Sequence, residues 1–331
     1  MFRRIRPDGF TLLLVGAVVL ASLAPCRGSV AIALDWATRA AITLLFFMHG
    51  AKLSREAVVH GLGAWRLHLG VAGSTFILFP LLGMAVALAP GVWVSDEVKV
   101  GVLFLCALPS TVQSSIALTA IAGGNVAAAV CSASLSNIVG VVLTPLLVGL
   151  MIHTQSEAAG DLLGAIGNVA LTLLAPFVVG HLSRPITAAF VDRHKVLLGR
   201  LDRGSILLVV YTAFSAAVIG GVWTRLTAGD LAVIAVLDVA LLAAVLGLTA
   251  FAARLAGLKV ADEIVLVFCG SKKSLASGVP MAAALFPAAT AGIIIVPLMM
   301  FHQLQLIVCA ILARRYAERG ETEPVQTRQP A

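Results

Sequence analysis

Residues 101–115 read GVLFLCALPSTVQSS and residues 264–278 read IVLVFCGSKKSLASG. When LFLCALPS is laid on LVFCGSKK, Cys106 falls on Cys269 at an offset of 163 residues. Both segments join an apolar half to a polar cluster. Pro109 removes a backbone donor in the first segment, and Gly270 weakens a helix in the second. Both are therefore predicted to be membrane helices broken in the middle, where freed backbone groups need an ion, a substrate or other protein groups as partners.

The composition of the chain places it in a membrane. Of its 331 residues, 60% are hydrophobic and 12% are charged, whereas about 25% of residues are charged in soluble domains. The basic residues lie between apolar segments, which excludes a nucleic-acid-binding face. The five cysteines show no paired spacing, so we expect neither a disulfide nor a zinc site. The sequence contains no nucleophile elbow, phosphate loop or metal-binding histidine pair, and we expect no enzyme.

A helix needs roughly 20 mostly apolar residues to cross a bilayer. Period-2 alternation is absent, so the predicted fold is an all-α polytopic membrane protein. The apolar start could also be a signal peptide, but its removal would leave nine spans and spoil the charge balance. Ten transmembrane helices are expected, near 10–26, 33–51, 67–89, 100–123, 125–152, 163–183, 205–224, 231–253, 264–286 and 288–313.

The distribution of basic residues predicts the orientation. With the N-terminus inside, 17 Lys and Arg residues fall in inside segments, among them Arg3, Arg4, Arg6, Arg55 and Arg328, and only Arg27, Lys99 and Arg225 fall outside. The positive-inside rule then places both termini in the cytoplasm. We expect the membrane to be the inner (plasma) membrane of the cell. The polar tail, residues 316–331, is predicted to be disordered.

The ten spans divide into two halves, residues 10–152 and 163–313, within one domain covering 1–331. Five spans per half is an odd number, so the halves would insert with opposite orientation, as inverted repeats do in many secondary transporters. A chance alignment of two apolar helices is the alternative. The polar clusters at the same depth in the fourth and ninth spans favour the repeat, and with it a binding site where those two broken helices cross.

The candidate site residues are the polar side chains of the two clusters. Charges are costly in hydrocarbon, and Lys272 and Lys273 are too far from either span end to reach the interface; the alternative is a structural ion pair. Asp238, deep in the eighth span, is either a partner for a lysine or a proton or ion ligand. The set comprises Gln113, Ser114, Ser115, Ser271, Lys272, Lys273, Ser274 and Asp238.

Weaker candidates lie on neighbouring spans. Ser132 and Asn137 belong to a polar fifth helix, where small hydroxyl groups also serve helix packing. His302, with Gln303 and Gln305 in the tenth span, could relay protons or could be a packing residue.

Four stretches of the sequence carry a resemblance to a known family: LDWATRAAITLLFFMHGAKLSREA (34–57), WRLHLGVAGSTFILFPLLG (65–83), LFLCALPSTVQSSIALTAIAGGNVAAAVCSASLSNIVGVVLTPLLVG (103–149) and FCGSKKSLASGVPMAAALF (268–286). They resemble the SBF-like branch of the bile acid:sodium symporter superfamily, which includes bacterial transporters and the seventh human member of solute carrier family 10. The resemblance covers about residues 5–315 and implies ten helices in two inverted five-helix repeats, with the fourth and ninth unwound where they cross.

Transferred position by position, most sodium ligands of the bile acid carriers are replaced here. The resemblance offers substitutes for one Ser-Asn pair at Gln113, Ser114 and Ser115, where a sodium ion would bind, and a poorer oxygen ligand at Thr75. The remaining ligands fall on Ala129, Ala133, Phe268 and Lys272. One explanation is that Lys272 or Lys273 supplies the positive charge permanently; another is that a lysine gains and loses a proton during transport.

The predicted function is secondary transport of a small organic anion by alternating access, with the two lysines helping to hold the anion. No cofactor is expected beyond sodium or a proton as coupling ion, and the lipid bilayer is the other partner. The alternative, which the resemblance also implies, is a regulatory membrane protein of calcium homeostasis without robust transport. A channel fits poorly, because the sequence has no ring of repeated charges.

Overall fold

The computed structural model of the chain describes residues 9–52, 64–153 and 170–322, and the regular structure in those ranges is helical, without a strand. The all-α prediction is thereby confirmed for the described residues. Arg3, Arg4, Arg6, Arg55 and Arg328, the start of the sixth expected span and the tail from residue 323 lie outside the described residues.

The first half of the chain is helical in its described residues, with a short break between α6 (Asp96–Ala107) and α7 (Gln113–Ile121). Its other described elements are α1 (Gly9–Leu23), α2 (Gly28–Lys52), α4 (Trp65–Gly73), the π-helical segment η2 (Ser74–Leu78), α5 (Phe79–Ala87) and α8 (Val126–His153).

The second half also contains a short break between two short helices, α15 (Val260–Gly270) and α16 (Leu275–Leu285), with a long helix before and after them. Its other described elements are η3 (Ala170–Leu174), α10 (Ala175–Leu182), α11 (Arg184–Arg193), α12 (Lys195–Ile219), α13 (Val222–Arg225), α14 (Ala228–Leu255) and α17 (Ala288–Thr322).

Several helices are long and apolar enough to cross a membrane, which makes the chain a multi-pass membrane protein. The described residues contain six such helices, and a bent pair, Leu171–Leu182 and Arg184–Val191 at 86°, would make a seventh. The expected spans 100–123 and 264–286 are each two short helices, α6 with α7 and α15 with α16. The six helices confirm membrane spans but not the predicted total of ten.

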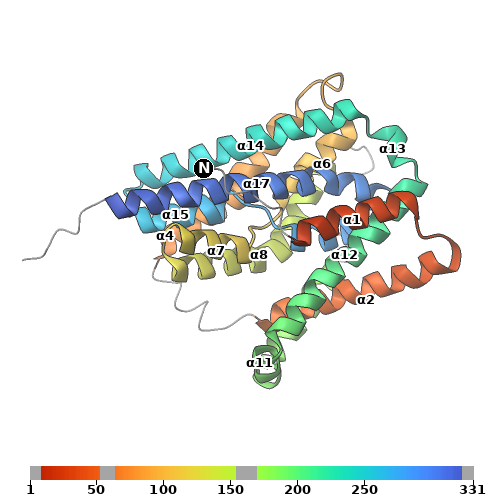
Figure 1. The fold of residues 1–331 in the computed structure, drawn as a ribbon, viewed down its shortest axis with the longest axis horizontal. Coiled ribbons are helices and arrows are strands. Elements are labelled where there is room, and N and C mark those ends of the chain that lie inside the picture. The colour runs from red at the N-terminus through yellow and green to blue at the C-terminus, as the bar shows by residue number, and fades with distance from the viewer. Residues whose placement is uncertain (1–8, 53–63, 154–169, 323–331) are drawn as a thin grey trace, which may run out of the picture.

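The helices pack in two groups that meet along α12 (Figure 1). In one group, α1 packs on α12, and α2 packs on α10, α11 and α12. In the other, α14 lies beside α15 and α17, while α6 packs on α5, α8 and α17. The two short broken pairs, α6 with α7 and α15 with α16, both belong to this second group, so the breaks lie among helices of one packed body.

Two glycines allow α2 and α10 to approach at backbone distance. A Cβ atom at Gly50 would overlap the carbonyl oxygen of Phe177, and a Cβ atom at Gly180 would overlap the carbonyl oxygen of Phe47. Small residues at such positions are the usual way in which membrane helices gain contact area, since burial from water contributes little there.

The C-terminal helix is longer than the sequence predicts. Disorder is predicted from residue 316, but α17 continues to Thr322, which corrects that boundary. The reason is a contact made by Tyr316, whose ring lies 6.2 Å from the ring of Phe268 and whose hydroxyl donates to the Glu263 carboxylate at 2.9 Å. An anchored side chain in this turn favours the ordered helix over a disordered tail.

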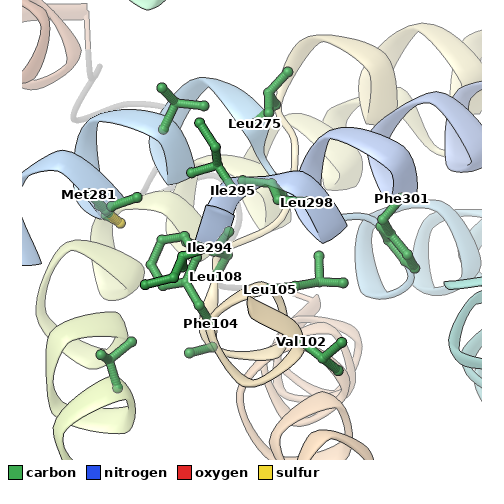
Figure 2. Close-up of a cluster of buried hydrophobic side chains, with 14 of the residues drawn as sticks. Val102, Phe104, Leu105, Leu108, Leu275, Met281, Ile294, Ile295, Leu298 and Phe301 are labelled. Atoms are coloured by element: carbon green, nitrogen blue, oxygen red, sulfur yellow. The ribbon is translucent and has the colours of Figure 1, made fainter. Parts of the chain in front are cut away.

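An apolar cluster surrounds the ends of the broken helices and keeps water from them. Figure 2 shows side chains of α6 and the residue that follows it packed against side chains of α16 and α17, all of them buried: Phe104, Leu105, Leu108, Leu275, Leu298 and Phe301. Polar groups enclosed here must find partners within the protein, because an unpaired buried donor or acceptor costs about 1–3 kcal/mol.

Candidate functional site

The two breaks contact each other directly. The backbone N–H of Ser274 donates to the carbonyl oxygen of Pro109 at 2.9 Å, and the Ser110 hydroxyl donates to the carbonyl oxygen of Cys269 at 2.5 Å. We call this contact between segments 108–112 and 271–274 the crossing. It brings together the two polar clusters that the sequence places 163 residues apart.

Lys273 is the most constrained side chain of the crossing. It is 0% exposed, and its ammonium nitrogen Nζ donates to the carbonyl oxygens of Thr75 at 2.9 Å, Cys106 at 2.8 Å and Leu108 at 2.6 Å. Nζ also lies 4.1 Å from the centroid of the Phe79 ring. An ammonium group has three N–H donors, so all three are used by backbone carbonyl groups.

The Thr75 carbonyl is available because of the π-helical turn. In η2 the N–H of Phe79 bonds to Ser74, five residues back, and so does not reach Thr75. The next N–H along the helix would come from Pro80, which has none. The Thr75 oxygen is thus left without a helical donor, and Lys273 supplies one.

The carbonyl groups at the end of α6 are available for a similar reason. In a continuous helix the N–H of Ser110 would bond to Cys106, but it donates to the Ser136 hydroxyl at 3.0 Å instead. The carbonyl of Ala107 accepts from the Thr144 hydroxyl at 2.9 Å. The oxygen of Cys106 remains for Lys273, whose positive charge also suits the negative end of the helix dipole.

At the end of α15, serine hydroxyl groups donate to the carbonyl oxygens that the helix leaves without a backbone donor. The carbonyl oxygens of Phe268 and Gly270 accept from Ser115 at 3.1 Å and from Ser74 at 2.8 Å, beside the Ser110 bond to Cys269. One broken helix is therefore capped by an ammonium group and the other by neutral hydroxyl groups.

Lys272 differs sharply from its neighbour. It is also 0% exposed, but its Nζ has no hydrogen-bond partner among the described residues. Nζ lies 5.5 Å from the centroid of the Phe268 ring, with Cys269 and Cys309 within electrostatic reach. A buried charge without hydrogen bonds is energetically unfavourable, and this sets Lys272 apart from the fully bonded Lys273.

The ion pair expected between Asp238 and a lysine is not formed. Asp238 is 1% exposed, and neither of its carboxylate oxygens finds a hydrogen-bond partner in the described part of the chain. The physical reason is that the Lys273 ammonium is occupied by carbonyl groups, while that of Lys272 lies over Phe268 between α15 and α17. The structure leaves open the other prediction for Asp238, a proton or ion ligand.

The three candidates of α7 lie on different faces of its first turn. Gln113 is exposed, Ser114 is half-buried and Ser115 is fully buried. The hydroxyl of Ser114 donates to Thr111 at 2.8 Å, and that of Ser115 lies 2.9 Å from the same Thr111 oxygen. Gln113 is the exposed member of this set.

Some of the weaker candidates contact the crossing, and others lie away from it. The Asn137 amide donates to the carbonyl of Ser110 and accepts from the Ser277 hydroxyl, each at 2.8 Å, so it joins α8 to both breaks. Ser132 contacts His68 at 2.7 Å, beside a pocket of about 390 Å³ between α4 and α8. Thr75 contributes its carbonyl, whereas its hydroxyl oxygen has no partner among the described residues.

The polar residues next to the lysines serve the backbone. Ser271 donates its hydroxyl to the carbonyl of Val267 at 2.5 Å, in its own preceding turn. Ser274 is the N-cap of α16, where its hydroxyl accepts from the N–H of Ser277 at 3.2 Å.

Gln305 is a central residue that the sequence analysis named only beside His302, as part of a possible proton relay, and did not select as a site residue. Its side-chain amide binds the backbone of Lys273 twice, accepting from the N–H at 2.8 Å and donating to the carbonyl at 2.9 Å. The same amide nitrogen lies 2.9 Å from Nδ1 of His302. An amide in the middle of an apolar span is the signal that could have identified it, because such a group needs partners there.

Comparison with known proteins identifies relatives along nearly the whole chain. A sequence model of the SBF-like CPA transporter family matches residues 8–318. The chain is 54% identical to "Uncharacterized protein PA2026" of Pseudomonas aeruginosa, over 96% of this chain and 95% of that protein. It is 53% identical to "Putative symporter YfeH" of Escherichia coli, over 97% and 96%. Identity to "Sodium/bile acid cotransporter 7-B" of Xenopus laevis is 26%, over 94% and 92%.

Proposed function

The chain belongs to the SBF-like CPA transporter family, and from this we propose that it moves a small organic anion across the membrane by alternating access around the crossing. Membership of this family makes the chain a transporter-family membrane protein and not an enzyme. The resemblance noted in the sequence is thereby confirmed at the level of the family, and the solute and coupling ion are what the proposal adds.

The proposed architecture is ten helices in two inverted repeats. The ends of α6 and α15, at Ala107 and Gly270, are separated by 163 residues, the same offset that aligns the two sequence segments. In each half a short break and a second short helix follow. This correspondence supports α6 with α7 as the fourth helix and α15 with α16 as the ninth, and it makes the crossing the centre of the mechanism.

We further propose that Lys273 takes the place of a coupling cation. Unwound backbone carbonyl groups and helix C-termini bind sodium ions in many secondary transporters. Here the oxygens of Thr75, Cys106 and Leu108 converge on an ammonium group that is part of the chain. This is the observation that carries the proposal: an amine of the chain itself fills the position among these carbonyl oxygens that a sodium ion would take.

Lys273 lies at the helix C-termini that lead into the breaks. The anion would bind at the helix N-termini that follow the breaks, at the beginnings of α7 and α16. Helix N-termini bind anions through their free N–H groups and the positive end of the dipole. Gln113 opens α7 and is exposed, so it could donate to a carboxylate or sulfonate. Lys272 would contribute charge, since its ammonium has no partner among the described residues.

Solute counterflow in proteoliposomes tests the function. Radiolabelled taurocholate and a panel of short carboxylates would be offered to vesicles loaded with the same unlabelled solute, in sodium or in choline chloride. We expect at least one anion to show counterflow, with equal rates in the two salts. A rate that depends on sodium would contradict the role of Lys273. Absence of counterflow for every anion would favour the regulatory alternative.

Sodium binding is also measurable without knowing the solute. A ligand that binds only the folded state raises the unfolding midpoint by mass action. The midpoint of the wild-type protein is expected to be the same in sodium chloride and choline chloride at equal ionic strength. A rise in sodium would show that another cation site exists.

A further inference from the structure

A second pocket lies between α14, α15 and α17. Its volume is about 440 Å³. Along most of its length the lining is apolar, with Leu246 and Ala250 from α14 and Val308 and Ile311 from α17. Gly247 also lines it, and a Cβ atom added there would meet no described atom within 4 Å. We call this pocket the α14–α17 groove.

One end of the α14–α17 groove is basic. Arg254 lies in the last turn of α14, and Arg315 and Arg319 lie one turn apart on α17, so their side chains share a face of that helix. All three are exposed. Glu263, on α15, pairs with Arg254 at 3.5 Å and accepts from Tyr316. Three guanidinium groups thus surround the mouth of an apolar groove.

The surroundings of the groove show which phase it faces. Beside it, α14 and α17 expose large apolar side chains, with Phe251 at 64% and Ile311 at 44% exposure. In a membrane-spanning protein such a surface faces lipid. From Leu246 to Arg254 the axial distance is roughly 12 Å at 1.5 Å per residue, so the apolar part is deep enough for much of an acyl chain.

We propose that the α14–α17 groove binds an anionic phospholipid, with its phosphate at Arg254, Arg315 and Arg319 and an acyl chain along Leu246 and Ala250. An apolar channel that faces hydrocarbon and ends at clustered arginines matches a ligand with a long apolar body and one anionic head. Basic pockets between membrane helices recognise anionic headgroups in this way, and guanidinium forks suit phosphate oxygens. The three arginines of this site are not part of the crossing, and the proposal does not depend on the solute proposed above.

The bound lipid would join three helices. Its headgroup ligands come from α14 and α17, and Val267 of α15 lines the same groove. Tyr316, another lining residue, bonds to Glu263 at the start of α15 and packs against Phe268 near its end. Occupancy should therefore stabilise the packing of α15, which leads into the crossing.

The test is a lipid titration on purified, delipidated full-length protein in detergent. Dioleoyl phosphatidylglycerol and dioleoyl phosphatidylcholine would be added, with bound lipid counted by native mass spectrometry and the unfolding midpoint followed in parallel. We expect phosphatidylglycerol to bind at least tenfold more tightly than phosphatidylcholine and to raise the midpoint. Equal binding of the two lipids would overturn the proposal, because it would show no recognition of charge.

Variants locate the site. The double variant Arg315→Gln/Arg319→Gln should bind phosphatidylglycerol roughly 30-fold more weakly, because it removes two basic groups that attract an anionic headgroup near the membrane surface. The matched control is Arg314→Gln, which removes an exposed arginine of the same helix that is not among the described residues lining the groove, and it should bind like the wild type. Equal affinity of the double variant and the control would refute the assignment.

A third variant tests the acyl-chain channel without changing charge. Gly247→Phe should fit the protein, because the position is open, and its ring should fill the groove and reduce phosphatidylglycerol binding at least tenfold. Unchanged binding by this variant would contradict the acyl-chain position. Glycerol 1-phosphate, which has the head without the chains, should not displace the lipid at millimolar concentration. Displacement would instead assign the arginines to a soluble anion.

Discussion

The two adjacent lysines should respond to the same substitution to very different extents: Lys273→Met should lower the stability of the protein strongly, and Lys272→Met should hardly change it. Lys273→Met removes a charged donor from three carbonyl oxygens at 2.6–2.9 Å. Hydrogen bonds to charged groups each contribute about 1.5–3 kcal/mol, and they are not additive when one group makes all of them. Each buried carbonyl acceptor left without a donor costs about 1–3 kcal/mol, part of which is offset by removing a buried charge, and we expect a net loss of stability of about 3–5 kcal/mol.

Lys272→Met is the matched control. Its ammonium makes no hydrogen bond to a described residue, and its contact with the Phe268 ring at 5.5 Å is worth about 0.5–2 kcal/mol. Methionine is an unbranched side chain one heavy atom shorter than lysine, so it fills most of the same space and removes the cost of burying a charge. The two effects nearly cancel, so this variant should change stability by less than about 1 kcal/mol, in either direction.

The unfolding midpoint in detergent, followed by fluorescence of the four tryptophans, measures both variants. The same midpoints are also measured in sodium chloride and in choline chloride. The carbonyl oxygens vacated in Lys273→Met should accept a cation, so sodium but not choline should restore part of the lost midpoint in this variant alone. Equal losses for the two lysine variants would refute the reasoning, because the hydrogen bonds would then not distinguish them.

Three further substitutions probe other contacts. Gln305→Leu should lower stability by about 2–4 kcal/mol, since it leaves both backbone groups of Lys273 without their amide partner, and hydrogen exchange of the 268–280 peptide should accelerate. Gly180→Ala should lower the unfolding midpoint by forcing α10 away from α2, whereas Gly199→Ala, which meets no described atom within 4 Å, should not lower it. Asp238→Asn should raise the midpoint more at high pH than at low pH, because the buried carboxylate is unfavourable only when ionised; an equal effect at both ends of the pH range would contradict this.

The sequence was sufficient to locate the breaks. Pro109 and Gly270 interrupt otherwise apolar helices within two residues of corresponding points, and polar side chains follow both. Local chemistry determines these features, because a missing donor or a missing Cβ atom acts on its own turn. The contact between the two breaks also follows, since freed backbone groups at mid-membrane depth need partners and the other break supplies them.

The roles of individual residues were less accessible. Lys272 and Lys273 have the same type and depth, so only the rotation of the chain after α15 decides which one reaches the carbonyl groups. Thr75 was selected for its hydroxyl, but its carbonyl is used, because that depends on the π-helical turn before Pro80. The predicted ion pair between Asp238 and a lysine was wrong for a related reason. The sequence of a helix shows how deep a side chain lies, but it does not show which neighbouring side chain it faces.

Lys273 also imposes an order on the biogenesis of the protein. A lysine at mid-membrane opposes insertion by roughly 2.5–3.5 kcal/mol, and α15 and α16, with 11 residues each, are too short to span a bilayer singly. The accepting carbonyl groups belong to Thr75, Cys106 and Leu108, which the ribosome completes long before residue 273. The acceptor is therefore in place when the charged segment emerges. A chain that began after residue 153 would lack it, and its α15 and α16 should fail to integrate.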